Sequence, residues 1–140
     1  MIAPRRQGGI ALIEAIVAVV LLGIGLLGAV GMQARSTSAL ADTAMRAQAT
    51  LAAESLLGTM AVDVANAGDY ALAAGGTPNA NSRLKPWYDA TRAQIPGAQI
   101  VIGVTPGTNR TAVDVKITWS RKTGAAPSAH RVLAYLSAAA

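Results

Sequence analysis

Residues 10–32 form an apolar segment with almost no interruption. Between residues 10 and 32 the only charged side chain is Glu14, and the preceding residues 1–9 include Arg5 and Arg6. A helix of this length would rise about 35 Å, which is enough to cross a hydrocarbon core of about 30 Å. The pattern therefore predicts a membrane-spanning helix over residues 10–32 behind a short basic leader over residues 1–9.

Glu14 stands out within this apolar segment. A charged side chain at the centre of a membrane helix costs about 2.5–3.5 kcal/mol, so an acid at this depth is expected to have a partner and a role. The alternative is that Glu14 extends to the lipid headgroups and serves no assembly purpose.

Beyond residue 32 the apolar positions become periodic rather than continuous. Residues 33–66 contain no proline, and apolar side chains recur at spacings of three and four, which places them on one face of a helix. These positions are Ala41, Met45, Ala49, Ala52, Leu56, Met60 and Val64. We therefore expect the helix to continue to about Asn66 with an amphipathic second half, reaching on the order of 85 Å in total, and its apolar stripe to cover a sheet.

Residues 67–140 predict a small head that follows the helix. Glycine, proline and asparagine in residues 67–84 indicate a loop, and Pro86 at a first helical position predicts a short helix to about Gln94. Ile95, Pro96 and Gly97 close that helix. Strands are expected over residues 99–105, 111–120 and 130–137, with turns at Pro106-Gly107 and over residues 122–128.

The middle strand shows the clearest alternation. Val113, Val115, Ile117 and Trp119 alternate with Asp114, Lys116 and Thr118, which is typical of a half-buried strand. Trp87 and Trp119 are expected to belong to the core. The short linkers favour an antiparallel meander. The predicted fold class is α+β: a long amino-terminal helix packed on a small antiparallel sheet.

Composition removes several classes of function. The chain has no cysteine, so it can form neither a disulfide nor a thiolate site, and its net charge of +5 is too scattered to favour nucleic acid. His130 is the only histidine and is expected to be structural. The carboxylates Asp42, Glu54 and Asp63 are assigned to a polar helix face and Asp114 to a solvent-facing strand position. We expect no catalytic residue, no metal site and no cofactor, and hence no enzyme.

The basic residues also predict an orientation. Arg5 and Arg6 lie on the amino side of the apolar segment, which favours a cytoplasmic leader, although Arg35 on the other side weakens the asymmetry. The rest of the chain is then expected outside the cytoplasm, on a single-pass anchor.

The amino terminus resembles a known class of signal. The sequence GIALIE at residues 9–14, followed by a long apolar helix, resembles the class III signal of type IV prepilins and type II secretion pseudopilins. The resemblance implies that a prepilin peptidase removes the leader after Gly9, that Ile10 becomes N-methylated, and that Glu14 serves subunit assembly. Cleavage would create an ammonium group at Ile10 in a low-dielectric setting, where the Glu14 of a neighbouring subunit attracts it strongly.

A second similarity is to PilV-type minor pilins of the type IV pilus. It is carried by LLGIGLLG at residues 21–28, by Met32 and Gln33, and by Trp87 and Trp119 in the carboxy-terminal half. It implies an inner-membrane protein, surrounded by lipid before assembly, that joins other major and minor pilins through the inner-membrane assembly platform. It then functions in pilus assembly, adhesion or twitching motility at the cell surface.

The chain departs from the pilin pattern at several positions. The mature chain would begin with Ile10 rather than phenylalanine or methionine, and it lacks the carboxy-terminal disulfide of many pilins. Major pilins commonly hold a proline where this chain has Gly31. Four glycines each weaken the helix by about 1 kcal/mol relative to alanine, which predicts flexibility on packing into a filament. They are Gly23, Gly25, Gly28 and Gly31.

Two alternatives to the minor pilin remain open at this point. One is a type II secretion minor pseudopilin, which shares the same assembly mechanism. The other is a signal-anchored or secreted periplasmic protein cleaved at the small residues Ala39-Leu40-Ala41. Ordinary signals have an apolar region of about 7–15 residues, whereas this one is longer and carries an acid.

Overall fold

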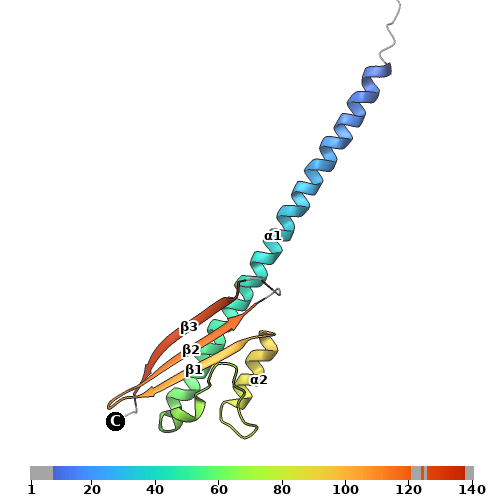
Figure 1. The fold of residues 1–140 in the computed structure, drawn as a ribbon. Coiled ribbons are helices and arrows are strands. Elements are labelled where there is room, and N and C mark those ends of the chain that lie inside the picture. The colour runs from blue at the N-terminus through green and yellow to red at the C-terminus, as the bar shows by residue number, and fades with distance from the viewer. Residues whose placement is uncertain (1–7, 121–123, 125, 138–140) are drawn as a thin grey trace, which may run out of the picture. The chain divides into compact units, whose positions relative to one another are not determined.

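The computed structural model describes residues 8–120, 124 and 126–137. The elements are the helices α1 (Gly8–Val62), η1 (Val64–Tyr70) and α2 (Lys85–Gln94), and the strands β1 (Gln99–Pro106), β2 (Thr111–Trp119) and β3 (Ser128–Leu136) (Figure 1). The chain divides between Asp42 and Thr43 into two compact units, and α1 contributes to both. A long amino-terminal apolar helix followed by a small antiparallel sheet confirms the predicted α+β class.

The end of α1 differs from the prediction. The helix stops at Val62 rather than near Asn66, and Asp63 has the non-helical backbone angles φ −127° and ψ 39°. The Asp63 carboxylate accepts hydrogen bonds from Asn66 Nδ2 at 2.6 Å and from the Tyr70 hydroxyl at 3.0 Å. In the backbone, Asp63 N–H donates to Met60 O at 3.2 Å and Asn66 N–H donates to Asp63 O at 3.0 Å, and a spacing of three is that of a 3-10 helix. The chain continues as the 3-10 helix η1, and the placement of Asp63 on a polar helix face was wrong.

The apolar stripe of α1 covers the sheet in the second unit, as predicted. Ala49, Ala52, Leu56 and Met60 are buried in one core with the strands, and Met45 and Val64 pack partly against it. Ala41 is exposed, in the first unit. The prediction missed Ala53, which is fully buried because a helix on a sheet buries a face wider than a single row of positions.

The three strands form an antiparallel meander in the order β1-β2-β3. Ile100 pairs with Ile117 and Ile102 with Val115, and all four side chains are buried. The predicted alternation in β2 is confirmed, since Val113, Val115, Ile117 and Trp119 are buried while the side chains between them are exposed or half-buried. β3 begins at Ser128, two positions before the prediction, and residues 122, 123 and 125 of the predicted turn over residues 122–128 lie outside the described residues.

The connection between α1 and β1 is more ordered than a loop. Residues 67–84 begin within η1, and the backbone of Leu72 then pairs with Ile102 of β1 through two hydrogen bonds of 2.9 Å. The short helix α2 starts at Lys85, one residue before the predicted Pro86, and ends at Gln94 as predicted. Gly97 has φ +76°, a conformation that suits glycine, at the predicted stop.

The two tryptophans have different environments. Trp119 is buried in the core, as expected. Trp87 is half-buried against that core, and its indole Nε1 donates a 2.8 Å hydrogen bond to the carbonyl oxygen of Ala52. This bond attaches α2 to the second half of α1 within the same unit.

Two leucines on α1 test this packing. Leu56 is 0% exposed and Leu51 is 65% exposed. Leu56→Ala should lower the free energy of unfolding of the head by about 2–5 kcal/mol, because it removes buried atoms and leaves a cavity. Leu51→Ala should change it by less than about 0.5 kcal/mol. Near-UV circular dichroism of the full chain in nonionic detergent measures both, and equal losses would contradict the packing.

Candidate functional site

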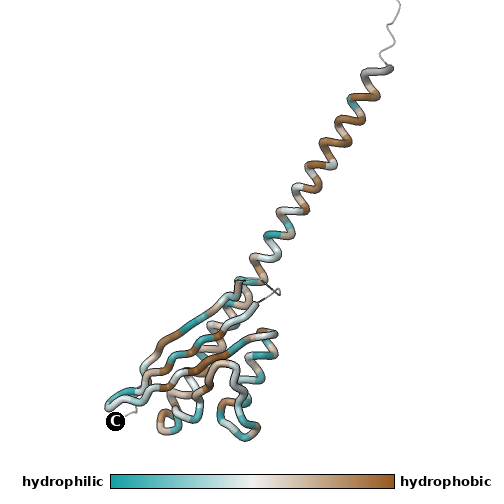
Figure 2. The backbone as a smooth tube through the Cα atoms, viewed as in Figure 1, coloured by the Kyte–Doolittle hydropathy of each residue, from teal (hydrophilic) through white to brown (hydrophobic). Residues whose placement is uncertain are grey.

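The first half of α1 presents its large apolar side chains outward. Between Leu12 and Met32 their exposed fraction ranges from 50% at Val17 to 75% at Leu27. Figure 2 shows this stretch as a nearly continuous run of hydrophobic residues. By length and composition α1 can cross a membrane, and none of its most apolar window is buried inside the fold. An apolar surface of this extent requires cover by lipid or by other apolar helices.

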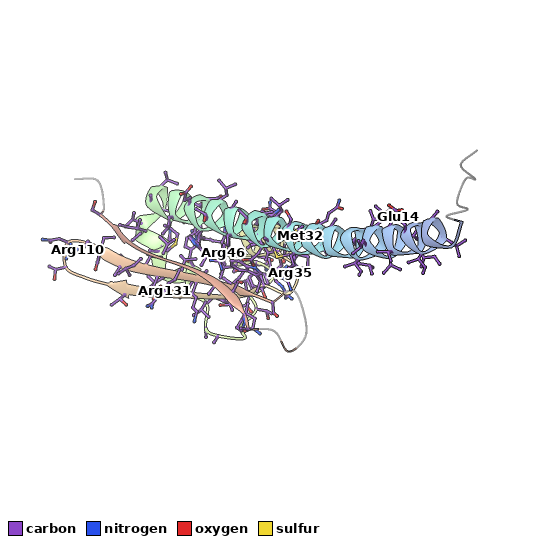
Figure 3. The ribbon with its side chains drawn as sticks, turned by 90° about the horizontal axis from the view of Figure 1, so that it is seen from above. Glu14, Met32, Arg35, Arg46, Arg110 and Arg131 are labelled. Atoms are coloured by element: carbon purple, nitrogen blue, oxygen red, sulfur yellow. The ribbon has the colours of Figure 1, made fainter. Side chains whose placement is uncertain are left out.

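Glu14 interrupts this surface (Figure 3). Its side chain is exposed, and within the described residues it has no hydrogen-bond or ion-pair partner. Burying a carboxylate in an apolar setting without a partner is costly. Any partner for Glu14 once this surface is covered must therefore come from outside the described chain.

The four glycines predicted to make the helix flexible lie within one unbroken helix. Gly23, Gly25, Gly28 and Gly31 have no positive φ, and a Cβ placed on each would meet nothing within 4 Å. The fold of this chain therefore does not itself require glycine at these positions. Their role in bending or unwinding stays a prediction.

The expected cleavage site lies where α1 begins. The helix starts at Gly8 and so includes Gly9 and Ile10, while the rest of the leader lies outside the described residues. The first N–H groups of a helix have no intrahelical partner, so its first turn opens easily. Cleavage after Gly9 and methylation of Ile10 stay predictions.

The head carries polar contacts that are structural in character. Asp114 and Arg131 form an ion pair across β2 and β3, with Arg131 NH2 and Asp114 Oδ2 at 2.6 Å, on the sheet face opposite the core. His130 Nε2 is buried on the side of β3 that faces the core, and no described residue forms a hydrogen bond with it. Among the described residues, no group of three histidine or carboxylate side chains is arranged to hold a metal ion.

Comparison with known proteins assigns the amino-terminal segment. Residues 4–30 match the family model described as the prokaryotic N-terminal methylation motif. No curated protein and no solved structure matches the chain. The motif confirms the predicted resemblance to a class III prepilin signal and supports a type IV pilin-like or pseudopilin-type protein.

The same motif also indicates the class of protein to which the chain is similar. It indicates a structural subunit rather than an enzyme, and it implies processing by prepilin peptidase and assembly with other pilins. Together with the apolar helix it fits membrane anchoring before assembly.

Sequence reasoning missed the group of side chains around Asp63. Besides Asn66 and Tyr70, the Arg83 guanidinium donates to Asp63 at 3.1 Å from a position twenty residues along the chain. The bonds from Asn66, Tyr70 and Arg83 hold the pKa of the Asp63 carboxyl below its ordinary value, although burial acts in the opposite direction. Burial and the bond to Asp63 raise the pKa of Tyr70. The spacing of Asp63 and Asn66 was a local signal for a turn, whereas nothing in the sequence linked Asp63 to Arg83.

A pH series tests the role of Asp63. Because its pKa is lower in the folded chain, its ionised form contributes stability above the ordinary value near 3.8, and this contribution is lost as the pH falls through the folded pKa. Asp63→Asn should therefore lower the melting temperature of the head at pH 7, and the gap to wild type should shrink below pH 4.

Asp69→Asn is the matched control, because Asp69 also lies beside Arg83, at 3.5 Å, but is 64% exposed. It should change the melting temperature little at any pH. A gap for Asp63→Asn that stays constant between pH 7 and pH 2.5 would contradict a contribution from the ionised carboxylate.

Proposed function

We propose that this chain is a PilV-type minor pilin of the type IV pilus. Residues 1–9 form a leader that prepilin peptidase removes, and residues 10–32 form the membrane and filament-core segment. Residues 33–66 carry this segment into the head formed by residues 67–140. The observation that supports this best is the match of residues 4–30 to the methylation motif, followed by a helix whose apolar side chains are exposed.

Before assembly, lipid covers this apolar surface. Arg5 and Arg6 keep the leader in the cytoplasm, and the head lies on the periplasmic side of the inner membrane. On assembly, apolar helices of other major and minor pilins replace the lipid, and the inner-membrane assembly platform provides the point of transfer. Burial of the helix then gains little in hydrophobic free energy, since lipid is as apolar as the new neighbours.

The polar contact of Glu14 then determines how subunits join. Cleavage after Gly9 creates an amine at Ile10, one helical turn and about 6 Å before Glu14. Two opposite charges about 4 Å apart attract by about 4 kcal/mol at an effective dielectric constant of 20. A contact between the Ile10 amine of one subunit and Glu14 of the next neutralises both charges and defines their axial register.

The run at residues 21–28 favours the pilin over the type II secretion pseudopilin, which would use the same contact. Copurification decides between them: sheared surface pili carry a minor pilin, whereas a secretion complex carries a pseudopilin.

The mature amino terminus tests the processing. Mass analysis of the protein from cells with prepilin peptidase should find N-methylated Ile10. Gly9→Val should leave Met1 in place because bulk before the cut blocks the peptidase, whereas Gly8→Val should still be cut. A wild-type protein that starts at Asp42 would indicate ordinary secretion, and an intact Met1 would indicate a plain anchor; either contradicts the proposal.

The role of Glu14 is tested separately. Glu14→Ala should be cleaved and methylated normally, because the peptidase acts before the acid finds its partner, but its recovery in sheared pili should fall at least tenfold. Glu54→Ala is the matched control, since Glu54 is an exposed acid in the second half of the same helix, and it should assemble normally. Equal recovery of Glu14→Ala and wild type rejects the assembly role.

A further inference from the structure

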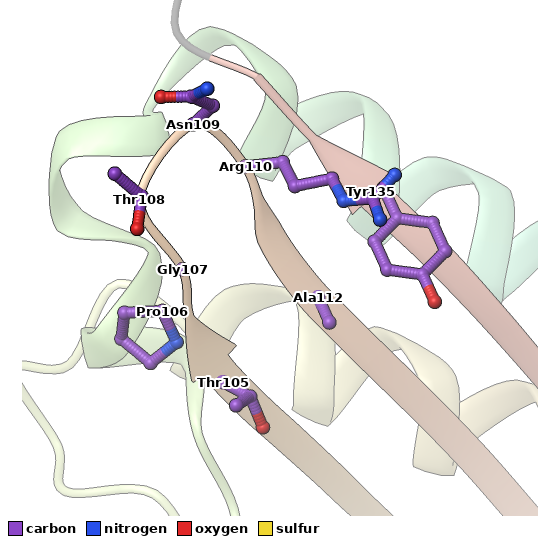
Figure 4. A pocket seen from close by; sticks show the side chains of 8 residues that line it. All are labelled: Thr105, Pro106, Gly107, Thr108, Asn109, Arg110, Ala112 and Tyr135. Carbon is purple, nitrogen blue, oxygen red and sulfur yellow. The ribbon is translucent and has the colours of Figure 1, made fainter.

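An open hollow lies beside the turn between β1 and β2 (Figure 4). It has a volume of about 600 Å³ and is widely open to solvent, so a ligand there would be only partly enclosed. Thr105, Ala112 and Tyr135 are paired across the three strands, so they share the sheet face opposite the core. The turn between β1 and β2, which lines this hollow, lies at the end of the second unit where α1 terminates (Figure 1).

Arg110 projects over this hollow and is held there by an aromatic ring. The central carbon of its guanidinium lies 4.5 Å from the centroid of the Tyr135 ring, a cation–π contact. Stacking on a ring occupies one face of the guanidinium and leaves the N–H groups at its edge directed outward. Figure 4 shows the two side chains beside each other.

The charge of Arg110 is not neutralised within the described chain. Arg131 and Arg83 each have a carboxylate partner, at 2.6 Å and 3.1 Å, whereas no described carboxylate forms an ion pair with Arg110. A guanidinium is charged at all physiological pH values and matches the two oxygens of a carboxylate with parallel hydrogen bonds. Arg110 is therefore a permanent cation whose edge donors, within the described chain, are available to a planar anion.

The turn fixes the backbone that carries Arg110. A Cβ on Gly107 would lie 2.6 Å from the carbonyl oxygen of Arg110, closer than side chains approach. Glycine at position 107 thus allows the chain to fold back tightly onto Arg110. The turn sets the position of the Arg110 backbone, and the Tyr135 ring contacts the guanidinium.

The rest of the lining is uncharged and polar. Thr105, Thr108 and Tyr135 contribute hydroxyls and Asn109 an amide, and these groups both donate and accept hydrogen bonds. Sugar hydroxyls have the same dual character. The exposed part of the Tyr135 ring adds an apolar surface of the kind on which a sugar ring can pack.

We propose that this hollow binds an acidic saccharide, with a sugar carboxylate on the Arg110 guanidinium and sugar hydroxyls on the threonine and asparagine side chains. A ligand site on the head is independent of how the amino terminus is processed. The proposal therefore goes beyond the role of the chain as a pilus subunit.

The test uses the full chain in nonionic detergent and isothermal titration calorimetry. The probes are trigalacturonate, its neutral counterpart galactotriose, and triaspartate, which carries carboxylates without sugar hydroxyls. Trigalacturonate should bind wild type at least tenfold more tightly than either of the other two. Arg110→Gln should weaken this binding at least tenfold, and Thr108→Val, which removes one hydroxyl and no charge, should weaken it severalfold.

Lys116→Gln is the matched control, because it removes a positive charge from the same sheet face at a position outside the hollow. It should leave binding within about twofold of wild type, and melting temperatures of all variants should match wild type because the sites are exposed. The proposal is overturned if wild type does not bind trigalacturonate, or if it binds triaspartate or galactotriose as tightly as trigalacturonate. It is also overturned if Arg110→Gln and Lys116→Gln weaken the binding of trigalacturonate equally. None of these results bears on the mature amino terminus, so the pilin assignment is judged separately.

Discussion

The large apolar side chains between Leu12 and Met32 are half or more exposed, and leaving such surface in water costs about 25 cal/mol per Å². This surface must be covered by lipid or by other apolar helices, and either cover encloses Glu14. In the proposed assembly, the hydrocarbon core of the membrane offers the carboxylate no positive charge, whereas another processed subunit would offer the amine that cleavage creates. On this proposal the two apolar environments differ in one polar contact, and that contact favours assembly over the membrane pool.

The head has a separate physical basis. Its core joins the second half of α1 to the inner face of the sheet, and the Trp87 indole and the Asp63 carboxylate attach the connecting segments to it. Since α1 contributes to both units, one element provides both the apolar surface and part of the core of the head. A single helix therefore serves two environments, and its composition changes from continuous apolar residues to a stripe where the environment changes.

Most of this organisation could be predicted because it depends on local periodicity. The alternation from Val113 to Trp119 determined which face of β2 is buried. Pro86 lies one residue after the start of α2, and the segment Ile95-Pro96-Gly97 follows directly after its end at Gln94. The spacing of Asp63 and Asn66 gave a local signal for the end of α1, whereas the contact of Asp63 with Arg83, twenty residues further along the chain, has no local pattern. The pairing of Leu72 with Ile102 and the stacking of Arg110 on Tyr135 are likewise tertiary contacts with no local pattern. The prepilin-type signal matched at residues 4–30 could be predicted because it is a linear segment, whereas the roles of Gly9, Ile10 and Glu14 stay predictions.

The central claim is that the Glu14 carboxylate of this chain contacts the terminal amine of a neighbouring pilin subunit. Solid-state NMR on pili tests it directly when this chain carries ¹³C in its glutamate carboxyl groups and the other pilin subunits carry ¹⁵N. The account predicts a dipolar coupling between the Glu14 carboxyl carbon and the terminal amine nitrogen of a neighbouring subunit, which corresponds to a separation of about 4–6 Å. Filaments that show other couplings between differently labelled subunits but none between these two atoms would contradict it.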